Sequence, residues 1–189
     1  MKVIFNLLQD MQVDATFCVL SAKNAYIIKE LFNILDFNYK GGLDDIQFCA
    51  FLEYATDLNS TQTSHIFDIF DLDKSGMVEF NEFYVLICII VAMKEGKAKN
   101  FLYKHWRTCF ELLDEDGSKA VSKDEFVTLG YLFGFSSEAV KQIYKEFDVS
   151  GNKELDIEEF RLFVFEAINV QQQLDSKPNK GFSIFNKFI

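Results

Sequence analysis

Oxygen-bearing side chains recur in four windows of twelve residues, which begin at Asp36, Asp71, Asp114 and Asp148 and which we number loops 1 to 4. Calcium is a hard cation that takes oxygen ligands, and such a loop can supply them from positions 1, 3, 5, 7, 9 and 12. Position 12 is best filled by a bidentate glutamate, and position 6 by a glycine that allows a sharp turn. The windows therefore predict Ca²⁺ as a ligand of this chain.

Loop 2 has every feature of this pattern. Position 6 is Gly76, position 7 offers a backbone carbonyl, and four of the ligand side chains are acidic. The predicted ligands are Asp71, Asp73, Ser75, the Met77 carbonyl, Glu79 and Glu82. We expect the tightest calcium site in this loop, because it combines the most acidic ligands with the glycine turn.

Loops 3 and 4 keep the glutamate at position 12 but have lysine at position 6. A lysine held at positive φ costs about 1 to 2 kcal/mol, so we expect calcium binding in both loops with reduced affinity. A frame shifted by two residues would put Gly117 or Gly151 at position 6. It would also place Lys123 or Ile157 at position 12, where neither can ligate calcium. The predicted ligands are, in loop 3, Asp114, Asp116, Ser118, the Ala120 carbonyl, Ser122 and Glu125 and, in loop 4, Asp148, Ser150, Asn152, the Glu154 carbonyl, Asp156 and Glu159.

Loop 1 lacks two essential ligands. Lys40 occupies position 5 and Gln47 replaces the glutamate at position 12, so a cation enters the cage and the bidentate carboxylate is lost. We expect no ion there. Position 8 is aliphatic in all four loops, and we expect loop 1 to pair with loop 2 as a short β-bridge through Leu43 and Val78.

The acidic loops also predict a response to pH. Carboxylates that crowd one another are expected to have raised pKa values, so that protons compete with calcium and acidification weakens binding. His65, which precedes loop 2, is a second group that can titrate near neutral pH.

Aromatic residues flank each loop at helical spacing, which predicts a core-facing helix on both sides of every loop. Four places before the loops stand Phe32, Phe67, Phe110 and Tyr144, and directly after them stand Phe48, Phe83, Phe126 and Phe160. We therefore predict an all-α fold of two EF-hand pairs, as calmodulin-like lobes. The loop starts are 35, 43 and 34 residues apart. This spacing predicts a helical N-terminal extension (1–20), an N-terminal lobe (21–93), a connector (94–100), a C-terminal lobe (101–170) and a tail (171–189).

The composition of the 189 residues narrows the class of protein. A net charge of −10 disfavours nucleic-acid binding and favours cations or basic partners. Two histidines, with no nucleophile motif and no phosphate-binding glycine loop, argue against an enzyme. Four scattered cysteines indicate reduced thiols and a cytoplasmic protein.

The segment from Phe83 to Met93 is apolar on every face, but a membrane-spanning helix needs about 20 residues. The segment must be buried, either by the chain itself between its lobes or by a partner. We expect a partner, because a soluble monomer rarely exposes a large apolar patch. The tail ends in the apolar stretch Gly181–Ile189, which indicates a docking peptide, with a disordered tail of no role as the alternative.

Two stretches carry a more specific resemblance, namely Phe83–Ile90 (FYVLICII) and Phe101–Gly117, which begins FLYKHWR. In these stretches the chain resembles the EF-hand calcium-sensing subunits of the sperm cation channel CatSper. The resemblance implies a regulatory subunit that responds to intracellular calcium and pH, pairs with a CatSper zeta-like small subunit and cytoplasmic parts of the channel, and does not prefer homo-oligomers. It also implies a location on the cytoplasmic side of the flagellar membrane, peripheral to it and without a transmembrane helix.

Two other functions remain open. An axonemal calcium sensor similar to calaxin would regulate ciliary dynein on microtubules. A calcium buffer would have several tight loops and little exposed apolar surface, whereas this chain has one complete loop and a long apolar segment. We favour the channel subunit.

Overall fold

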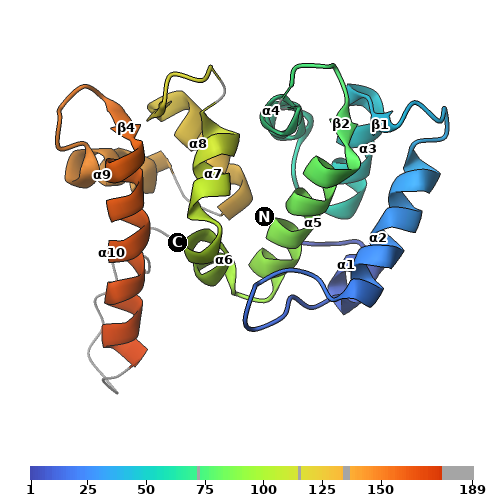
Figure 1. The fold of residues 1–189 in the computed structure, drawn as a ribbon, viewed down its shortest axis with the longest axis horizontal. Helices are drawn as coiled ribbons and strands as arrows, with labels where there is room; N and C mark the ends of the chain where they lie inside the picture. Colours follow the sequence, from blue (N-terminus) through green and yellow to red (C-terminus); the bar gives the residue numbers. More distant parts are fainter. Residues whose placement is uncertain (72, 115, 134–136, 176–189) are drawn as a thin grey trace. The chain divides into compact units, whose positions relative to one another are not determined.

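The computed structural model of the chain describes residues 1–71, 73–114, 116–133 and 137–175 (Figure 1). The described residues form helices and two short β-ribbons, in two compact units of residues 1–101 (unit 1) and 102–189 (unit 2). The predicted all-α class is confirmed.

Unit 1 holds the first two helix–loop–helix hands. Its elements are α1 (Asn6–Asp10), α2 (Ala22–Leu35), β1 (Gly42–Leu43), α3 (Asp45–Ala55), α4 (Ser60–Phe70), β2 (Val78–Glu79), α5 (Phe80–Lys94) and α6 (Ala98–Lys104), which continues into unit 2. Loop 1 joins α2 to α3 (hand 1), and loop 2 joins α4 to α5 (hand 2) (Figure 1). The two loops pair as an antiparallel ribbon in which Leu43 lies opposite Val78, which confirms the predicted pairing.

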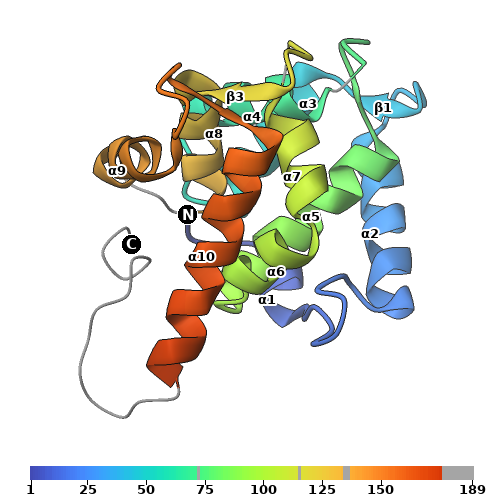
Figure 2. The same cartoon turned by 60° about the vertical axis from the view of Figure 1, so that its left-hand side comes forward.

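Unit 2 repeats this arrangement. Its elements are α7 (Trp106–Leu113), β3 (Ala120–Ser122), α8 (Lys123–Phe133), α9 (Ser137–Phe147), β4 (Glu154–Asp156) and α10 (Ile157–Asp175). Loop 3 joins α7 to α8 (hand 3), and loop 4 joins α9 to α10 (hand 4). Val121 lies opposite Leu155 in the β3–β4 ribbon, and α10 packs against α7 and α9 (Figure 2).

The flanking aromatic residues form the core of each unit. The ring that precedes one loop contacts the ring that follows the paired loop, and edge-to-face or tilted ring pairs of this kind contribute about 0.5 to 1.5 kcal/mol each. The pairs are Phe32–Phe83 (centroids 5.5 Å apart), Phe48–Phe67 (5.6 Å), Phe110–Phe160 (5.5 Å) and Phe126–Tyr144 (5.7 Å). All eight rings are buried, so the predicted core-facing stripe is confirmed.

Helix α5 is buried within the chain, so our expectation that a partner covers it is wrong. It contacts α1, α2 and α4 of its own unit. Its apolar residues are at most 2% exposed at eight positions: Phe83, Leu86, Ile87, Cys88, Ile89, Ile90, Val91 and Ala92.

The N-terminal segment, residues 1–20, forms hydrogen bonds with both ends of α5. Near the start of the helix, the Tyr84 hydroxyl donates a hydrogen bond to the Leu20 carbonyl at 3.4 Å. Just past its end, the Val13 N–H donates to the Glu95 carboxylate at 3.0 Å. The Lys94 ammonium group donates to three carbonyl groups at the end of α1, those of Leu8, Gln9 and Met11. The segment supplies the cover that we had assigned to a partner.

No helix in the described ranges combines the length and the apolar character needed to cross a membrane.

The C-terminal end of unit 2 differs from the predicted boundary. Helix α10 continues to Asp175, beyond the predicted end of the C-terminal lobe at residue 170. The apolar stretch Gly181–Ile189 lies outside the described residues, so its docking role stays a prediction.

Candidate metal centre

The aspartate at position 1 is held in the same way in all four loops. One of its carboxylate oxygens, Oδ2, accepts a hydrogen bond from the backbone N–H of position 6 at 2.8 to 3.0 Å. The pairs are Gly41–Asp36, Gly76–Asp71, Lys119–Asp114 and Lys153–Asp148. In loops 3 and 4 the bond comes from Lys119 and Lys153, so the lysines occupy the turn position of the chosen frames.

Backbone strain is shared equally among the loops. Position 6 has positive φ in all four loops, and so does position 4. Loops 1 and 2 have glycine at position 6 and a bulky residue at position 4, whereas loops 3 and 4 have the reverse. The non-glycine residues are Tyr39 (φ 55°), Lys74 (54°), Lys119 (66°) and Lys153 (69°). Each loop therefore has one non-glycine residue at positive φ and pays its free-energy cost once. Lysine at position 6 is thus no reason to expect a lower calcium affinity in loops 3 and 4 than in loop 2.

In loops 2 and 3, the predicted ligands at positions 1, 5 and 7 converge. The Ser75 hydroxyl lies 3.3 Å from an Asp71 carboxylate oxygen and 3.1 Å from the Met77 carbonyl. Ser118 has the same two distances, to Asp114 and to the Ala120 carbonyl. Three oxygen atoms thus face one point in each loop, as a hard cation requires.

Besides being a predicted ligand, the glutamate at position 12 caps the helix that follows the loop. One oxygen of each glutamate accepts the N–H of position 9, which is the capping-box arrangement at a helix start. The distances are 2.8 Å for Glu82 and Glu79, 2.6 Å for Glu125 and Ser122, and 3.1 Å for Glu159 and Asp156. The cap holds the carboxylate at the mouth of the loop.

Loop 3 is where the carboxylates gather most closely. Asp114, Asp116 and Glu125 each place an oxygen within 4.8 Å of the others, and the described ranges contain no second group of three carboxylates as close. In loop 4, by contrast, the other Glu159 oxygen accepts the Ser150 N–H at 2.8 Å. Loops 2 and 4 therefore hold their predicted ligands in a more open arrangement than loop 3.

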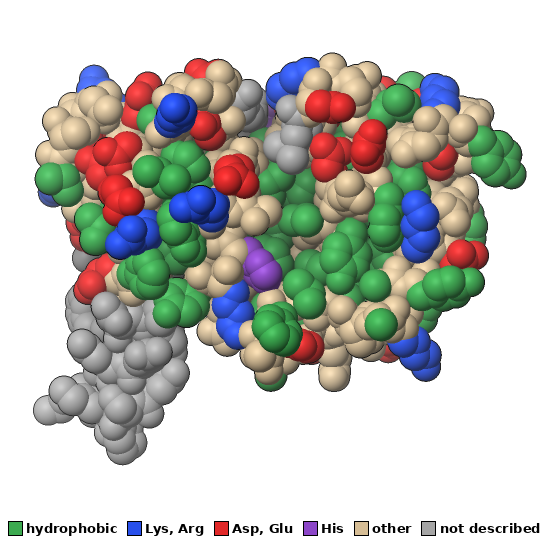
Figure 3. All heavy atoms as spheres, in the orientation of Figure 1, with side chains coloured by type: hydrophobic (Ala, Val, Ile, Leu, Met, Phe, Trp, Pro, Cys, Tyr) green, Lys and Arg blue, Asp and Glu red, His purple; other side chains and the backbone are tan. Residues whose placement is uncertain are grey.

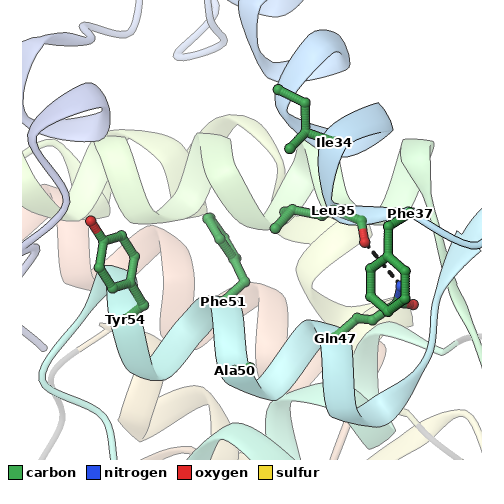
Figure 4. Close-up of a pocket in the computed structure, with 7 residues that line it drawn as sticks. All are labelled: Ile34, Leu35, Phe37, Gln47, Ala50, Phe51 and Tyr54. Atoms are coloured by element: carbon green, nitrogen blue, oxygen red, sulfur yellow. Dashed lines mark hydrogen bonds between the residues drawn. The ribbon is translucent and has the colours of Figure 1, made fainter.

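Loop 1 fills its own cage with protein groups. The buried Asp36 carboxylate accepts the N–H groups of Lys40 and Gly41 at 2.9 and 2.8 Å. The Lys40 ammonium lies 3.4 Å from the Asp44 carboxylate, at position 9. Gln47 Nε2, at position 12, donates to the Leu35 carbonyl at 2.9 Å (Figure 4). A lysine and an amide thus occupy the positions where a calcium loop places its oxygen ligands.

Hydrogen bonds within the loops act on the pKa of two carboxyl groups. The side chain and backbone of Ser75 lower the pKa of Asp73 below its ordinary value of 3.8. The backbone and side chain of Ser118 do the same to the pKa of Asp116. Hydrogen bonds to the charged form favour it, and their effect outweighs the desolvation that would raise the pKa. Our expectation of raised pKa values is wrong for these two ligands.

Acidic side chains lie over the loop-bearing end of each unit (Figure 3). These side chains offer a metal ion only oxygen ligands. Oxygen ligands suit Ca²⁺ and do not suit the softer metals, which prefer nitrogen or sulfur.

Comparison with known proteins agrees with this geometry. EF-hand domain pairs match residues 53–87 and residues 103–164. The chain is 25% identical over 138 residues to the uncharacterized calcium-binding protein B0563.7 of Caenorhabditis elegans. It is 32% identical over 120 residues to calcium-dependent protein kinase 4 of Plasmodium falciparum, and 28% identical over 134 residues to guanylyl cyclase-activating protein 3 of Homo sapiens.

These matches cover 72%, 64% and 65% of the chain, but they span 58%, 20% and 60% of the three relatives. The match to the kinase is thus confined to a fifth of that protein. Paired helix–loop–helix hands, oxygen-lined loops and these matches lead to one conclusion: the chain belongs to the EF-hand calcium-binding protein family, and Ca²⁺ is the ion that it binds.

Proposed function

We propose that this protein is a calcium sensor that regulates a partner protein, with calcium in loops 2, 3 and 4 and none in loop 1. The observation that carries the proposal is the β1–β2 ribbon. Glu79, a predicted ligand of loop 2, lies opposite Gly42 of loop 1. An ion in loop 2 therefore acts directly on hand 1, which binds no ion of its own.

Hand 1 presents an apolar surface suited to a partner. A pocket of about 340 Å³ opens between α2 and α3, lined by Ile34, Leu35, Phe37, Gln47, Ala50, Phe51 and Tyr54 (Figure 4). Ile34 is 73% exposed, Phe37 65% and Tyr54 67%. Exposed apolar residues grouped around a pocket mark an interaction site rather than ordinary surface.

The charge around this pocket indicates the kind of partner. Residues 22–55, which form hand 1, include five acidic and three basic side chains. An amphipathic helix with an apolar face and basic flanks would complement this surface in shape and charge. Calcium in loop 2 would change the affinity of hand 1 for that helix.

The names of two relatives support regulation rather than buffering. One is a calcium-dependent protein kinase, and the other activates guanylyl cyclase. Both names describe control of an activity, and both proteins are similar to this chain over about two thirds of its length. We infer that this chain likewise controls an activity, namely that of a partner protein.

At a finer level, we propose a calcium-sensing subunit of a CatSper-type sperm flagellar channel, similar to EF-hand calcium-binding domain-containing protein 9. Its partner would be a CatSper zeta-like small subunit, and its place the cytoplasmic side of the flagellar membrane. Support comes from the resemblance of Phe83–Ile90 and Phe101–Gly117 and from the partner surface on hand 1. An axonemal sensor similar to calaxin is the alternative.

The test is coexpression with the CatSper zeta-like subunit, followed by copurification with and without calcium. Ile34→Glu combined with Phe37→Glu should abolish the complex, because two charges then enter the pocket. Leu162→Glu, a charge on an exposed residue of unit 2, is the matched control and should leave the complex intact. No complex with the wild-type chain, and retention on microtubules after membrane detergent, would instead favour the axonemal sensor.

A further inference from the structure

Unit 2 contains a pocket whose charge is opposite to that of the chain as a whole. It has a volume of about 260 Å³ and lies among α9, the start of α8 and loop 4. Its lining residues are Lys123, Lys141, Tyr144, Lys145, Asp148 and Lys153. Four ammonium groups and one carboxylate thus meet at one place, in a protein with a net charge of −10. We call it the lysine pocket.

In the described part of the chain, none of the four lysines forms an ion pair with a carboxylate. The ion pairs in the described part of the chain are Lys40–Asp44, Lys97–Glu95 and Arg161–Glu158, all elsewhere. The carboxylate of Asp148 is engaged by the backbone N–H groups of Gly151 and Lys153, at 2.7 and 2.9 Å. Like charges brought together in this way repel one another unless an anion joins them.

A rigid framework holds the lysines together. The Tyr144 hydroxyl donates to the Val121 carbonyl at 2.7 Å and so ties α9 to β3, and Lys123 directly follows β3. The β3–β4 ribbon places Ser122 opposite Glu154, which brings Lys123 and Lys153 to the same side of the unit. Lys141 and Lys145 stand four residues apart on α9 and therefore share a face. The pairing of β3 with β4 therefore helps to bring together the three parts of the chain that line the pocket, namely the start of α8, α9 and loop 4.

We propose that the lysine pocket binds a phosphate-bearing anion, either a soluble phosphate ester or the headgroup of an anionic lipid. Lysine binds phosphate as a compact point charge with three N–H donors, and several lysines around one small pocket suit a group with more than one negative charge. The volume accommodates a headgroup rather than a large ligand.

Calcium and the anion should favour each other's binding, an inference that rests on the proposed occupancy of loop 4. Asp148 is position 1 and Lys153 is position 6 of that loop, so both belong to the pocket and to the calcium site. An ion on Asp148 removes the one negative charge that lines the pocket. By linkage, the anion must raise the calcium affinity of loop 4 by the same factor.

The experiment uses the full chain with two probes: inositol trisphosphate, and phosphatidylcholine vesicles with or without phosphatidylinositol bisphosphate. We expect binding that Lys141→Gln/Lys145→Gln weakens about tenfold or more, since two of four positive charges are removed. The matched control is Lys23→Gln/Lys104→Gln, which removes two exposed helical lysines outside the pocket and should change affinity less than about twofold. Binding of the soluble probe identifies a soluble ester as a ligand, and binding of the vesicles alone identifies a lipid.

Failure of both probes to bind the wild-type chain, or equal weakening in both double variants, overturns the lysine pocket. Calcium is then added to the wild-type chain and to Glu159→Gln. We expect calcium to raise anion affinity in the wild type alone, while Glu159→Gln keeps its calcium-free affinity. Anion binding that does not respond to calcium in the wild type would support the pocket and overturn its coupling to loop 4.

Discussion

Gln47 Nε2 donates a hydrogen bond to the backbone carbonyl of Leu35 at 2.9 Å, so that the residue at position 12 of loop 1 links the end of α2 to the start of α3. The other end of the same amide, Oε1, accepts the N–H of Asp44 at 3.1 Å. A glutamate could make the second bond but not the first, because a carboxylate has no donor. Gln47 therefore links two helices at the position where the other hands have a predicted calcium ligand.

The first prediction is that Gln47→Glu destabilises unit 1 and creates no calcium site. The new carboxylate would face the Leu35 carbonyl, and the lost donor should lower the free energy of unfolding by about 1 to 3 kcal/mol. Urea unfolding measures this loss, and calorimetry counts the calcium ions. Gln62→Glu is the matched control, because Gln62 caps α4 through its oxygen alone and should tolerate the change.

A gain of calcium binding by Gln47→Glu alone would contradict this account. Addition of Lys40→Asp should reverse the outcome, since it removes the ammonium group beside Asp44 and supplies an oxygen ligand at position 5. The double variant should bind one more calcium ion per chain than the wild type.

The second prediction is that Glu82→Gln removes the tightest calcium site. Loop 2 has four acidic ligand side chains, whereas loops 3 and 4 have three each. Calorimetry of Glu82→Gln and Glu125→Gln compares the two best candidates. Loss of the tightest site in Glu125→Gln instead would mean that the close grouping of Asp114, Asp116 and Glu125 outweighs the number of charges.

The third prediction concerns strain at positions 4 and 6. Lys74→Gly and Lys119→Gly should each raise the free energy of unfolding by about 0.5 to 1 kcal/mol, because relief of the left-handed backbone exceeds the entropy cost of glycine. Chemical unfolding measures both. Stabilisation by Lys119→Gly alone would show that position 4 bears no strain.

The fourth prediction is that calcium affinity stays constant from mildly acidic to mildly alkaline buffer. The pKa values of Asp73 and Asp116 are lowered by hydrogen bonds, so both groups are ionised throughout this range. At these two groups protons compete with calcium only as the pH falls toward the lowered values, and the stabilising bonds to their carboxylates are lost in the same acidic range. Calcium titrations across a pH series test this, and a steady decline of affinity between pH values near neutrality would contradict it.

The fifth prediction is that removal of residues 1–20 exposes α5. The truncated chain should bind a hydrophobic dye and self-associate, because α1, which contains the buried Leu8, no longer contacts the helix. Dye fluorescence and size-exclusion chromatography measure both effects. A chain that ends at Asp175 is the control and should behave like the full chain. An unchanged, monomeric truncated chain would show that other parts of unit 1 suffice.

The calcium chemistry and the paired hands were determined by the sequence itself. The predicted ligand positions, the predicted loss of a site in loop 1 and the aromatic stripe each depend on residues within or directly beside one loop. Such local patterns specify local geometry, because a loop of fixed length with a capped outgoing helix has few conformations. The Leu43–Val78 pairing followed from the same repeat.

Only the tertiary structure decided what covers α5, since Val13 and Glu95 are 82 residues apart and no local pattern relates them. The lysine pocket is likewise assembled from α8, α9 and loop 4 by strand pairing. The pKa of Asp73 depends on where the Ser75 hydroxyl points, which spacing does not specify. The sequence shows one glycine per loop at position 4 or 6. Only the backbone angles reveal that both positions have positive φ, so that the strain is equal in all four loops. Contacts between distant segments depend on how whole faces pack, and composition and periodicity leave that choice open.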